Sequence, residues 1–127
     1  MNPKAIETWE SIVRSGDLSL LDPLLAEDVV FESPVVHTPQ VGRSRTRVYL
    51  GGAVMALKSG EFQFVGRWFC DRSAVLEFRT RLDGLDVNGV DIISWNAADQ
   101  ITHFKVMVRP LKAIQAVQEA ISRQLQL

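Results

Sequence analysis

The feature that most constrains the fold is a pair of apolar segments between Val87 and Pro110, separated by the polar stretch NAADQ. In the second segment, Phe104, Val106 and Val108 alternate with polar or flexible side chains. An alternation with a period of two is typical of a strand that has one apolar face. The first segment is apolar on both faces, which indicates a strand buried inside a sheet. We therefore predict a β-hairpin over residues 87–110, with its first strand at the centre of the sheet.

Asp91 is an acidic residue in the middle of this central strand. It shares a face with Val87, Ile93 and Trp95. A buried aspartate needs either a partner for its charge or a raised pKa. Two interpretations follow. Asp91 is either a polar group in a pocket, acting as a neutral hydrogen-bond donor or a base, or a structural carboxylate paired with Arg109 or Lys105.

Turn and helix signals place the other elements around the hairpin. Asn2 is the expected N-cap and Pro3 the first residue of a helix that has Ile6, Trp9 and Ile12 at helical spacing and ends at Gly16. Asp83-Gly84 is a strong signal for a tight turn between two strands. The remaining pattern predicts a short helix capped by Ser19, a strand over 29–33, a loop over 35–42, a helix over 44–57 that ends at Gly60, strands over 62–69 and 74–82, and a last helix from Pro110.

The two later helices are each expected to bury a defined apolar side. In the helix over 44–57 we expect Val48, Met55 and Ala56 to point inward. The Gly51-Gly52 pair there costs about 1 kcal/mol per glycine relative to alanine, and indicates either close approach by another group or a local weakness. In the last helix the predicted stripe consists of Leu111, Ile114, Val117, Ile121 and Leu125.

The order of elements predicts an α+β fold. Three helices and one early strand precede an antiparallel meander and a final helix, and a chain of 127 residues has the size of one domain, covering 1–127. We expect a cone-shaped, curved and mostly antiparallel sheet wrapped around the N-terminal helices, with an extra C-terminal helix. Such a sheet leaves an apolar hollow, where small molecules commonly bind.

Composition argues against several classes of partner. A net charge of −1 gives no electrostatic basis for binding nucleic acid. The first residues, MNPKAIETWE, lack an apolar signal core, and no apolar run is long enough to span a bilayer, so we expect a cytoplasmic protein with no membrane partner. The single Cys70 excludes an internal disulfide, and His37 and His103 have no recognisable metal spacing. We expect neither a metal nor an organic cofactor.

Three segments together resemble the nuclear transport factor 2-like superfamily. They are WESIVRSGDLSLLDPLLAEDVVFESP, VGRSRTRVYL and GVDIISWNAADQITHF. Within that superfamily the chain is most similar to the SnoaL-like branch, which also includes ketosteroid isomerases. The resemblance covers nearly the whole chain except the last helix. It implies an α+β cone that often forms a homodimer through the outer face of the sheet, where Val75, Ile92 and Met107 are apolar.

The resemblance to ketosteroid isomerase carries over only in part. The aspartate of the oxyanion hole corresponds to Asp91, and the tyrosine of the first helix corresponds to Trp9, which keeps an N–H donor but loses the phenol. The catalytic base corresponds to Ser33. An unassisted serine cannot remove a carbon-bound proton near neutral pH, so steroid isomerisation by that mechanism is excluded.

These observations define a candidate site. Asp91 and His37 are the candidate catalytic groups, although a loop histidine such as His37 is also often simply exposed. The predicted function is to bind a small hydrophobic molecule; conversion by cofactor-free acid/base chemistry, of isomerase, cyclase, dehydratase or hydrolase type, stays open. The alternative is a non-catalytic ligand-binding or protein-interaction module. The expected ligand-binding residues are Trp9, Phe31, Ser33, Tyr49, Met55, Phe78 and Trp95.

Overall fold

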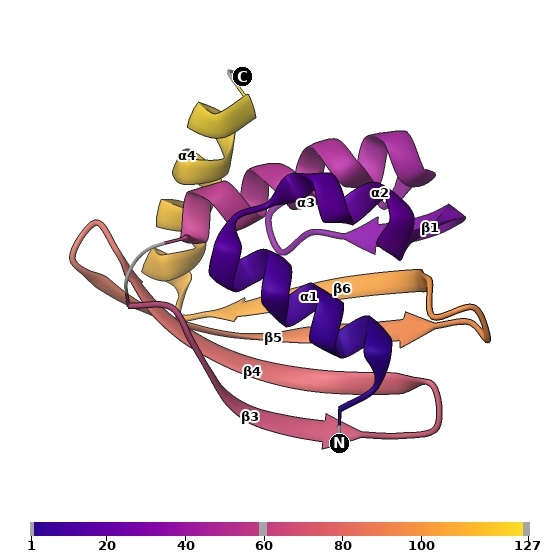
Figure 1. Cartoon of the computed structure of the whole chain (residues 1–127). Coiled ribbons are helices and arrows are strands. Elements are labelled where there is room, and N and C mark those ends of the chain that lie inside the picture. Colours follow the sequence, from indigo (N-terminus) through magenta and orange to yellow (C-terminus); the bar gives the residue numbers. More distant parts are fainter. Residues whose placement is uncertain (1, 59–60, 126–127) are drawn as a thin grey trace.

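A curved sheet of six strands carries helices on one face (Figure 1). This computed structural model describes residues 2–58 and 61–125. The helices are α1 (Lys4–Ser15), the 3₁₀ helix η1 (Leu18–Leu20), α2 (Leu21–Leu24), α3 (Arg43–Leu57) and α4 (Leu111–Leu125). The strands are β1 (Leu25–Glu32), β2 (Gln40–Val41), β3 (Gln63–Phe69), β4 (Ser73–Leu82), β5 (Leu85–Trp95) and β6 (Ile101–Arg109).

The strand order confirms that the predicted hairpin lies inside the sheet. The order is β2-β1-β6-β5-β4-β3, so β5 pairs with β4 on one side and with β6 on the other. All neighbouring strands are antiparallel except β1 and β6, which run parallel. Asp83 and Gly84 both have positive φ, 52° and 77°, as a two-residue turn that matches the twist of the strands requires.

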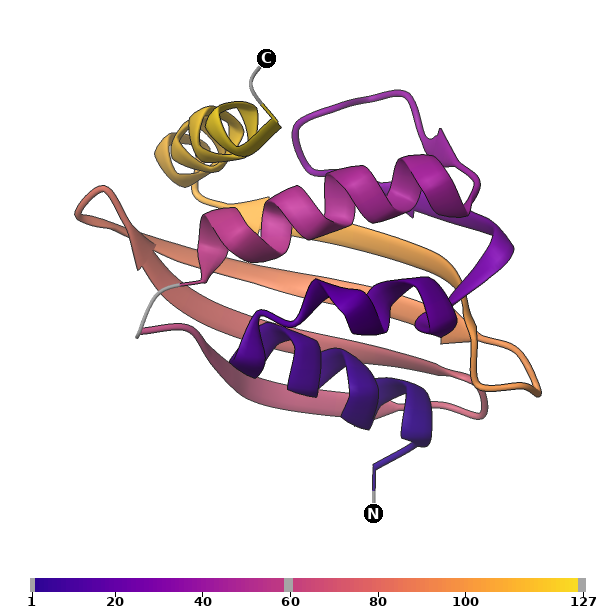
Figure 2. The same ribbon diagram turned by 45° about the horizontal axis from the view of Figure 1, so that its top comes forward.

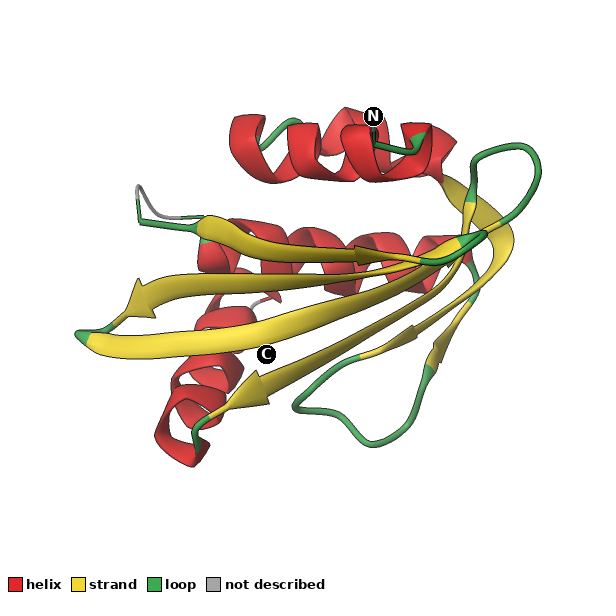
Figure 3. Ribbon diagram, turned by 90° about the horizontal axis from the view of Figure 1, so that it is seen from below, coloured by secondary structure: helices red, strands yellow, loops and turns green. Residues whose placement is uncertain are grey.

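The helices and strands form two layers, and the α+β prediction is confirmed. Figure 2 shows α1 and α3 on the same face of the sheet, with α4 beside one end of α3. Figure 3 distinguishes the two layers by colour. We call the opposite side of the sheet the outer face. Within the described residues, no helix combines the length and the apolar character that a membrane span needs.

Several predicted boundaries in the first half of the chain are wrong. Pro3 stands at the cap position before α1, and Asp17, whose Oδ1 accepts from the Ser19 backbone N–H at 3.1 Å, caps η1 in place of Ser19. β1 begins at Leu25, earlier than expected, because the leucines assigned to the short helix continue directly into the sheet. The predicted loop contains β2, which pairs with β1.

The buried side of α3 also differs from the prediction. Val48 and Met55 are 49% and 38% exposed, whereas Thr46, Leu50 and Val54 face the core. Their spacing of four residues gives one helical face. The paired glycines are sites of close approach by side chains: a Cβ at Gly51 would lie 3.4 Å from Leu18, and one at Gly52 would lie 3.0 Å from Leu125. The predicted end at Gly60 lies outside the described residues.

In α4 the buried face consists of smaller side chains than the predicted stripe. Val117 and Ile121 are buried as expected, but Leu111 is 70% exposed. The rest of the buried face consists of Ala113, Ala116 and Ala120. Alanines allow α4 to lie close to the neighbouring elements, so the contact is made by small side chains and not by the longest apolar ones.

Candidate functional site

A small cavity lies between the helices and the inner face of the sheet. The space in which the centre of a water-sized sphere can move is about 40 Å³. This figure counts only the positions of the sphere's centre, so the space available to the atoms of a ligand is larger. Its lining is Trp9, Val13, Phe31, Pro34, Leu50, Ala53, Val54, Leu57, Lys58, Phe62, Phe78, Asp91, Phe104, Val106, Val108, Val117 and Ile121.

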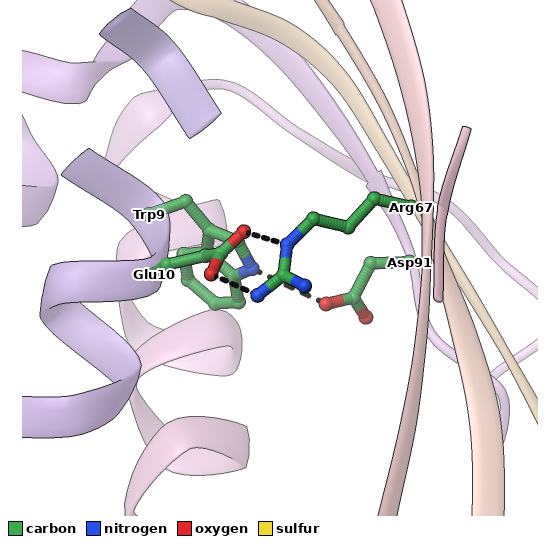
Figure 4. A network of polar contacts seen from close by, with 4 residues as sticks. All are labelled: Trp9, Glu10, Arg67 and Asp91. Atoms are coloured by element: carbon green, nitrogen blue, oxygen red, sulfur yellow. Dashed lines mark hydrogen bonds and ion pairs between the residues drawn. The ribbon is translucent and has the colours of Figure 1, made fainter. Parts of the chain in front are cut away.

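Asp91 is the buried ionisable group on this wall. Its residue is only 4% exposed, and its neighbours across the sheet are Leu76 on β4 and Val106 on β6. The Trp9 indole Nε1–H donates to Asp91 Oδ2 at 3.2 Å (Figure 4). Burial raises the pKa of the Asp91 carboxyl to about 7, against the opposing effect of the Trp9 hydrogen bond. A neutral carboxyl is therefore present in a large fraction of molecules near neutral pH.

The interpretation of Asp91 as a carboxylate paired with Arg109 or Lys105 is wrong. Arg109 lies across from Asn88 and donates to its Oδ1 at 3.4 Å, while Lys105 Nζ lies 3.6 Å from Glu32 Oε2. Both cations occupy positions of β6 that alternate with the inward-facing ones. Because successive strand residues face opposite sides, neither side chain can reach Asp91 through the sheet.

A second polar pair ties α1 to the sheet close to Asp91. Arg67 on β3 donates from Nε to Glu10 Oε2 at 2.8 Å and from Nη2 to Glu10 Oε1 at 2.6 Å (Figure 4). The Glu10 carboxylate raises the pKa of the Arg67 guanidinium. Glu10 is 5% exposed, so this two-pronged pair neutralises a buried charge.

The Glu10–Arg67 pair escaped the sequence analysis because a β-bulge determines it. Phe64 pairs with Phe78, but the next pair joins Gly66, not Val65, to Glu77. The extra residue shifts the alternation by one, so that Arg67 lies opposite the buried Leu76 and points inward. The only signal in the sequence was a glutamate beside Trp9 on an apolar helix face.

The structure brings together some of the predicted site residues and separates others. Trp9, Phe31, Phe78 and Asp91 all line the cavity.

Five predicted residues lie elsewhere. Ser33 and Tyr49 line a separate cleft of about 160 Å³ towards α4, which Phe31 also borders. His37 is exposed and lines a cleft of about 550 Å³ along β6. Met55 and Trp95 line neither the cavity nor these clefts. Their roles as ligand contacts stay predictions.

The outer face carries a polar cluster that sequence reasoning did not identify. His103 Nε2–H donates to Glu32 Oε2 at 2.6 Å, across the parallel β1–β6 pair. The hydrogen bond from His103, with help from the positive charge of Lys105, holds the pKa of the Glu32 carboxyl below its usual value. This cluster lies on the far side of the sheet from Asp91.

Comparisons with known proteins agree with the overall fold. The SnoaL-like domain profile matches residues 6–104. A steroid delta-isomerase from Pseudomonas aeruginosa is 31% identical with a TM-score of 0.89, over 99% of this chain and 94% of that chain. An uncharacterised protein with a cystatin-like fold from Silicibacter pomeroyi DSS-3 is also 31% identical with a TM-score of 0.88, over 97% of this chain and 86% of that chain. Among curated proteins, none matches this chain.

The profile match covers α1 from Ile6 onward and the strands up to Phe104. It includes the whole cavity wall except Val106, Val108, Val117 and Ile121. The sequence resemblance to this superfamily is thus confirmed by both sequence and structure. The chain belongs to the SnoaL-like domain family of the nuclear transport factor 2-like superfamily.

Proposed function

We propose that this protein binds a small hydrophobic molecule that carries one hydrogen-bonding oxygen, such as a ketone or an alcohol. The observation that carries the proposal is the buried Asp91 carboxyl on the wall of a mostly apolar cavity. A carboxyl buried without a cation costs stability, because its charged form loses its hydration. Strongly perturbed acids of this kind are typical of binding and catalytic sites.

The neutral form of Asp91 suits this role. It supplies an O–H donor, and the Trp9 indole N–H, which donates to Asp91 Oδ2, holds the carboxyl in position. A ligand oxygen accepts from this O–H, while the apolar part of the ligand contacts Phe31, Phe78 and Phe104. Steroid isomerisation, the activity named for the Pseudomonas relative, is not proposed for this chain, because Ser33 stands where that mechanism needs a carboxylate base.

Titration with cyclohexanone at several pH values tests the proposal. If only the protonated carboxyl donates to the ketone, a pKa of about 7 makes the affinity roughly thirty-fold lower at about pH 8.5 than at about pH 5.5. Chemical shifts of the Trp9 indole N–H report binding inside the cavity. Asp91→Asn should abolish the pH dependence, since an amide does not titrate.

Asp28→Asn is the matched control, because Asp28 is exposed on β1 and lines none of the clefts described. It should keep the full pH dependence. An affinity of the unmodified protein that does not change with pH, or a failure of cyclohexanone to shift the Trp9 resonance, would contradict the proposal.

Proton transfer on the bound molecule is a second candidate, favoured by the pKa of about 7. An acid or base is most effective when its pKa lies near the working pH. The carboxylate form of Asp91 would take a proton from the carbon beside a ligand carbonyl and return it to the far end of the resulting dienolate. Conversion of 3-cyclohexenone to 2-cyclohexenone, followed by ultraviolet absorbance, should then rise with pH through about 7. Equal rates for the unmodified protein and Asp91→Asn would refute proton transfer by Asp91, and only the binding function would then remain.

A further inference from the structure

A groove between α1 and β3 adjoins the cavity. It encloses about 640 Å³ of open space and shares Val13, Lys58 and Phe62 with the cavity wall. The shared residues form the wall between the apolar interior and the groove. A ligand of the cavity that is longer than the cavity itself would extend into this groove.

The groove carries an excess of positive charge. Arg14, Lys58 and Arg67 line it together with a single carboxylate, that of Glu10. Glu10 is already held by both prongs of Arg67, at 2.6 and 2.8 Å, so this pair has little net charge to offer a ligand. The excess therefore resides on Arg14 and Lys58.

Arg14 and Lys58 have side-chain N–H donors that are available to a ligand. Within residues 2–58 and 61–125, Arg14 makes no side-chain hydrogen bond or ion pair, and it is exposed. Lys58 Nζ donates to the Ser15 carbonyl oxygen at 3.4 Å, which uses one of its three N–H groups. Both side chains can thus turn towards an anion in the groove without breaking an ion pair.

We propose, on the basis of the function proposed above, that the ligand is a hydrophobic carboxylic acid. Its apolar chain lies in the cavity beside Asp91, and its carboxylate lies in the groove on Arg14 and Lys58. The opposite orientation would bury a second carboxylate in an apolar space that already holds Asp91, which costs far more than leaving the charge in the solvated groove. Charge-assisted hydrogen bonds to two cations are then the specificity element for the acid over its neutral analogues.

Octanoate and octanamide, which share a chain and differ in charge, test this assignment. At about pH 7.5 octanoate is ionised, and at low ionic strength it should bind about tenfold more tightly than octanamide. Both probes should shift the Trp9 indole N–H, whereas Trp68, which is 57% exposed on the outer face, should not respond. The affinity ratio of the two probes is the readout.

The variant Arg14→Gln/Lys58→Gln should bring that ratio close to one. The control Arg45→Gln/Lys112→Gln removes the same charge from exposed positions outside the groove and should keep the ratio. Thermal melting of both variants verifies that they fold.

Three results would overturn the proposal. Equal affinities of the unmodified protein for the two probes would refute the charge preference and leave the cyclohexanone site standing. If Arg14→Gln/Lys58→Gln keeps the preference for octanoate over octanamide, the carboxylate does not bind on Arg14 and Lys58. Failure of both octanoyl probes to shift Trp9 would refute the chain in the cavity, and the cyclohexanone titration would then decide separately whether the simpler site exists.

Discussion

At the scale of single residues, Asp91 determines both the chemistry of the cavity and part of the pH dependence of stability. Its carboxyl is buried, accepts only from Trp9 among the described residues, and has a pKa raised to about 7 from 3.8. A raised folded-state pKa means that the carboxyl stabilises the fold fully below about pH 3.8, where both states are protonated. Above that value the unfolded state releases its proton first, and the contribution is lost as the pH rises to about 7.

This sign gives a prediction for Asp91→Asn. The free energy of unfolding of the unmodified protein should fall by about 3 kcal/mol between about pH 4 and pH 7 through this one group, since each pKa unit is worth about 1.4 kcal/mol. The variant lacks that loss, so it should gain stability relative to the unmodified protein over the same range. Denaturant unfolding at about pH 4, 7 and 8 measures the difference.

Asp28→Asn, at an exposed position, is the control and should show no comparable gain. A variant that becomes less stable than the unmodified protein as the pH rises to 8 would mean that Asp91 is ionised and compensated in the folded protein.

At the scale of elements, the bulge in β3 gives α1 its second polar attachment to the sheet. Glu10 is buried, whereas the Arg67 side chain is 36% exposed. Removal of Arg67 alone leaves a buried carboxylate without its cation. We predict that Arg67→Met costs about 2 kcal/mol, less than for a fully buried pair because solvent partly screens the arginine.

The double variant Glu10→Met/Arg67→Met should recover most of that loss, since neither charge is then left unpaired. Arg81→Met is a matched control: it removes an exposed arginine whose ion-pair partners Glu61 and Asp86 are 64% and 84% exposed, and should cost below about 1 kcal/mol. Denaturant melts at neutral pH distinguish the cases. If Arg67→Met is as mild as Arg81→Met, the pair does not hold α1 to the sheet.

At the scale of the whole molecule, the outer face of the sheet is partly apolar. Trp68 and Met107 are 57% and 52% exposed, and the helices of the described chain lie on the other face. Exposed apolar patches on a sheet often mark association between subunits. We propose that two copies associate through this face with two-fold symmetry.

Sedimentation at micromolar concentration should therefore give about twice the chain mass of 14.2 kDa. Met107→Lys should shift the protein towards the monomer, because it sets a charge in an apolar contact. Leu111→Lys, at a position 70% exposed on α4, should leave the dimer intact. A monomer in the unmodified protein at that concentration would refute association through the outer face.

Local patterns in the sequence were enough for the elements whose own residues specify them. The alternation in β5 and β6, the turn at Asp83-Gly84 and the end of α1 at Gly16, with φ of 72°, all follow from short-range geometry and sterics. Period-two patterns also placed Asp91 on an inward face. The fold class then followed from the order of these elements.

Tertiary structure alone decided the features that join distant segments. The bond between Trp9 and Asp91 spans 82 positions in the chain, and it forms only because the curvature of the sheet brings β5 under α1. The inward turn of Arg67 depends on a one-residue shift in β3, and the buried face of α3 depends on contacts with Leu18 and Leu125. Register and packing are cooperative properties of the whole fold, so no local pattern encodes them.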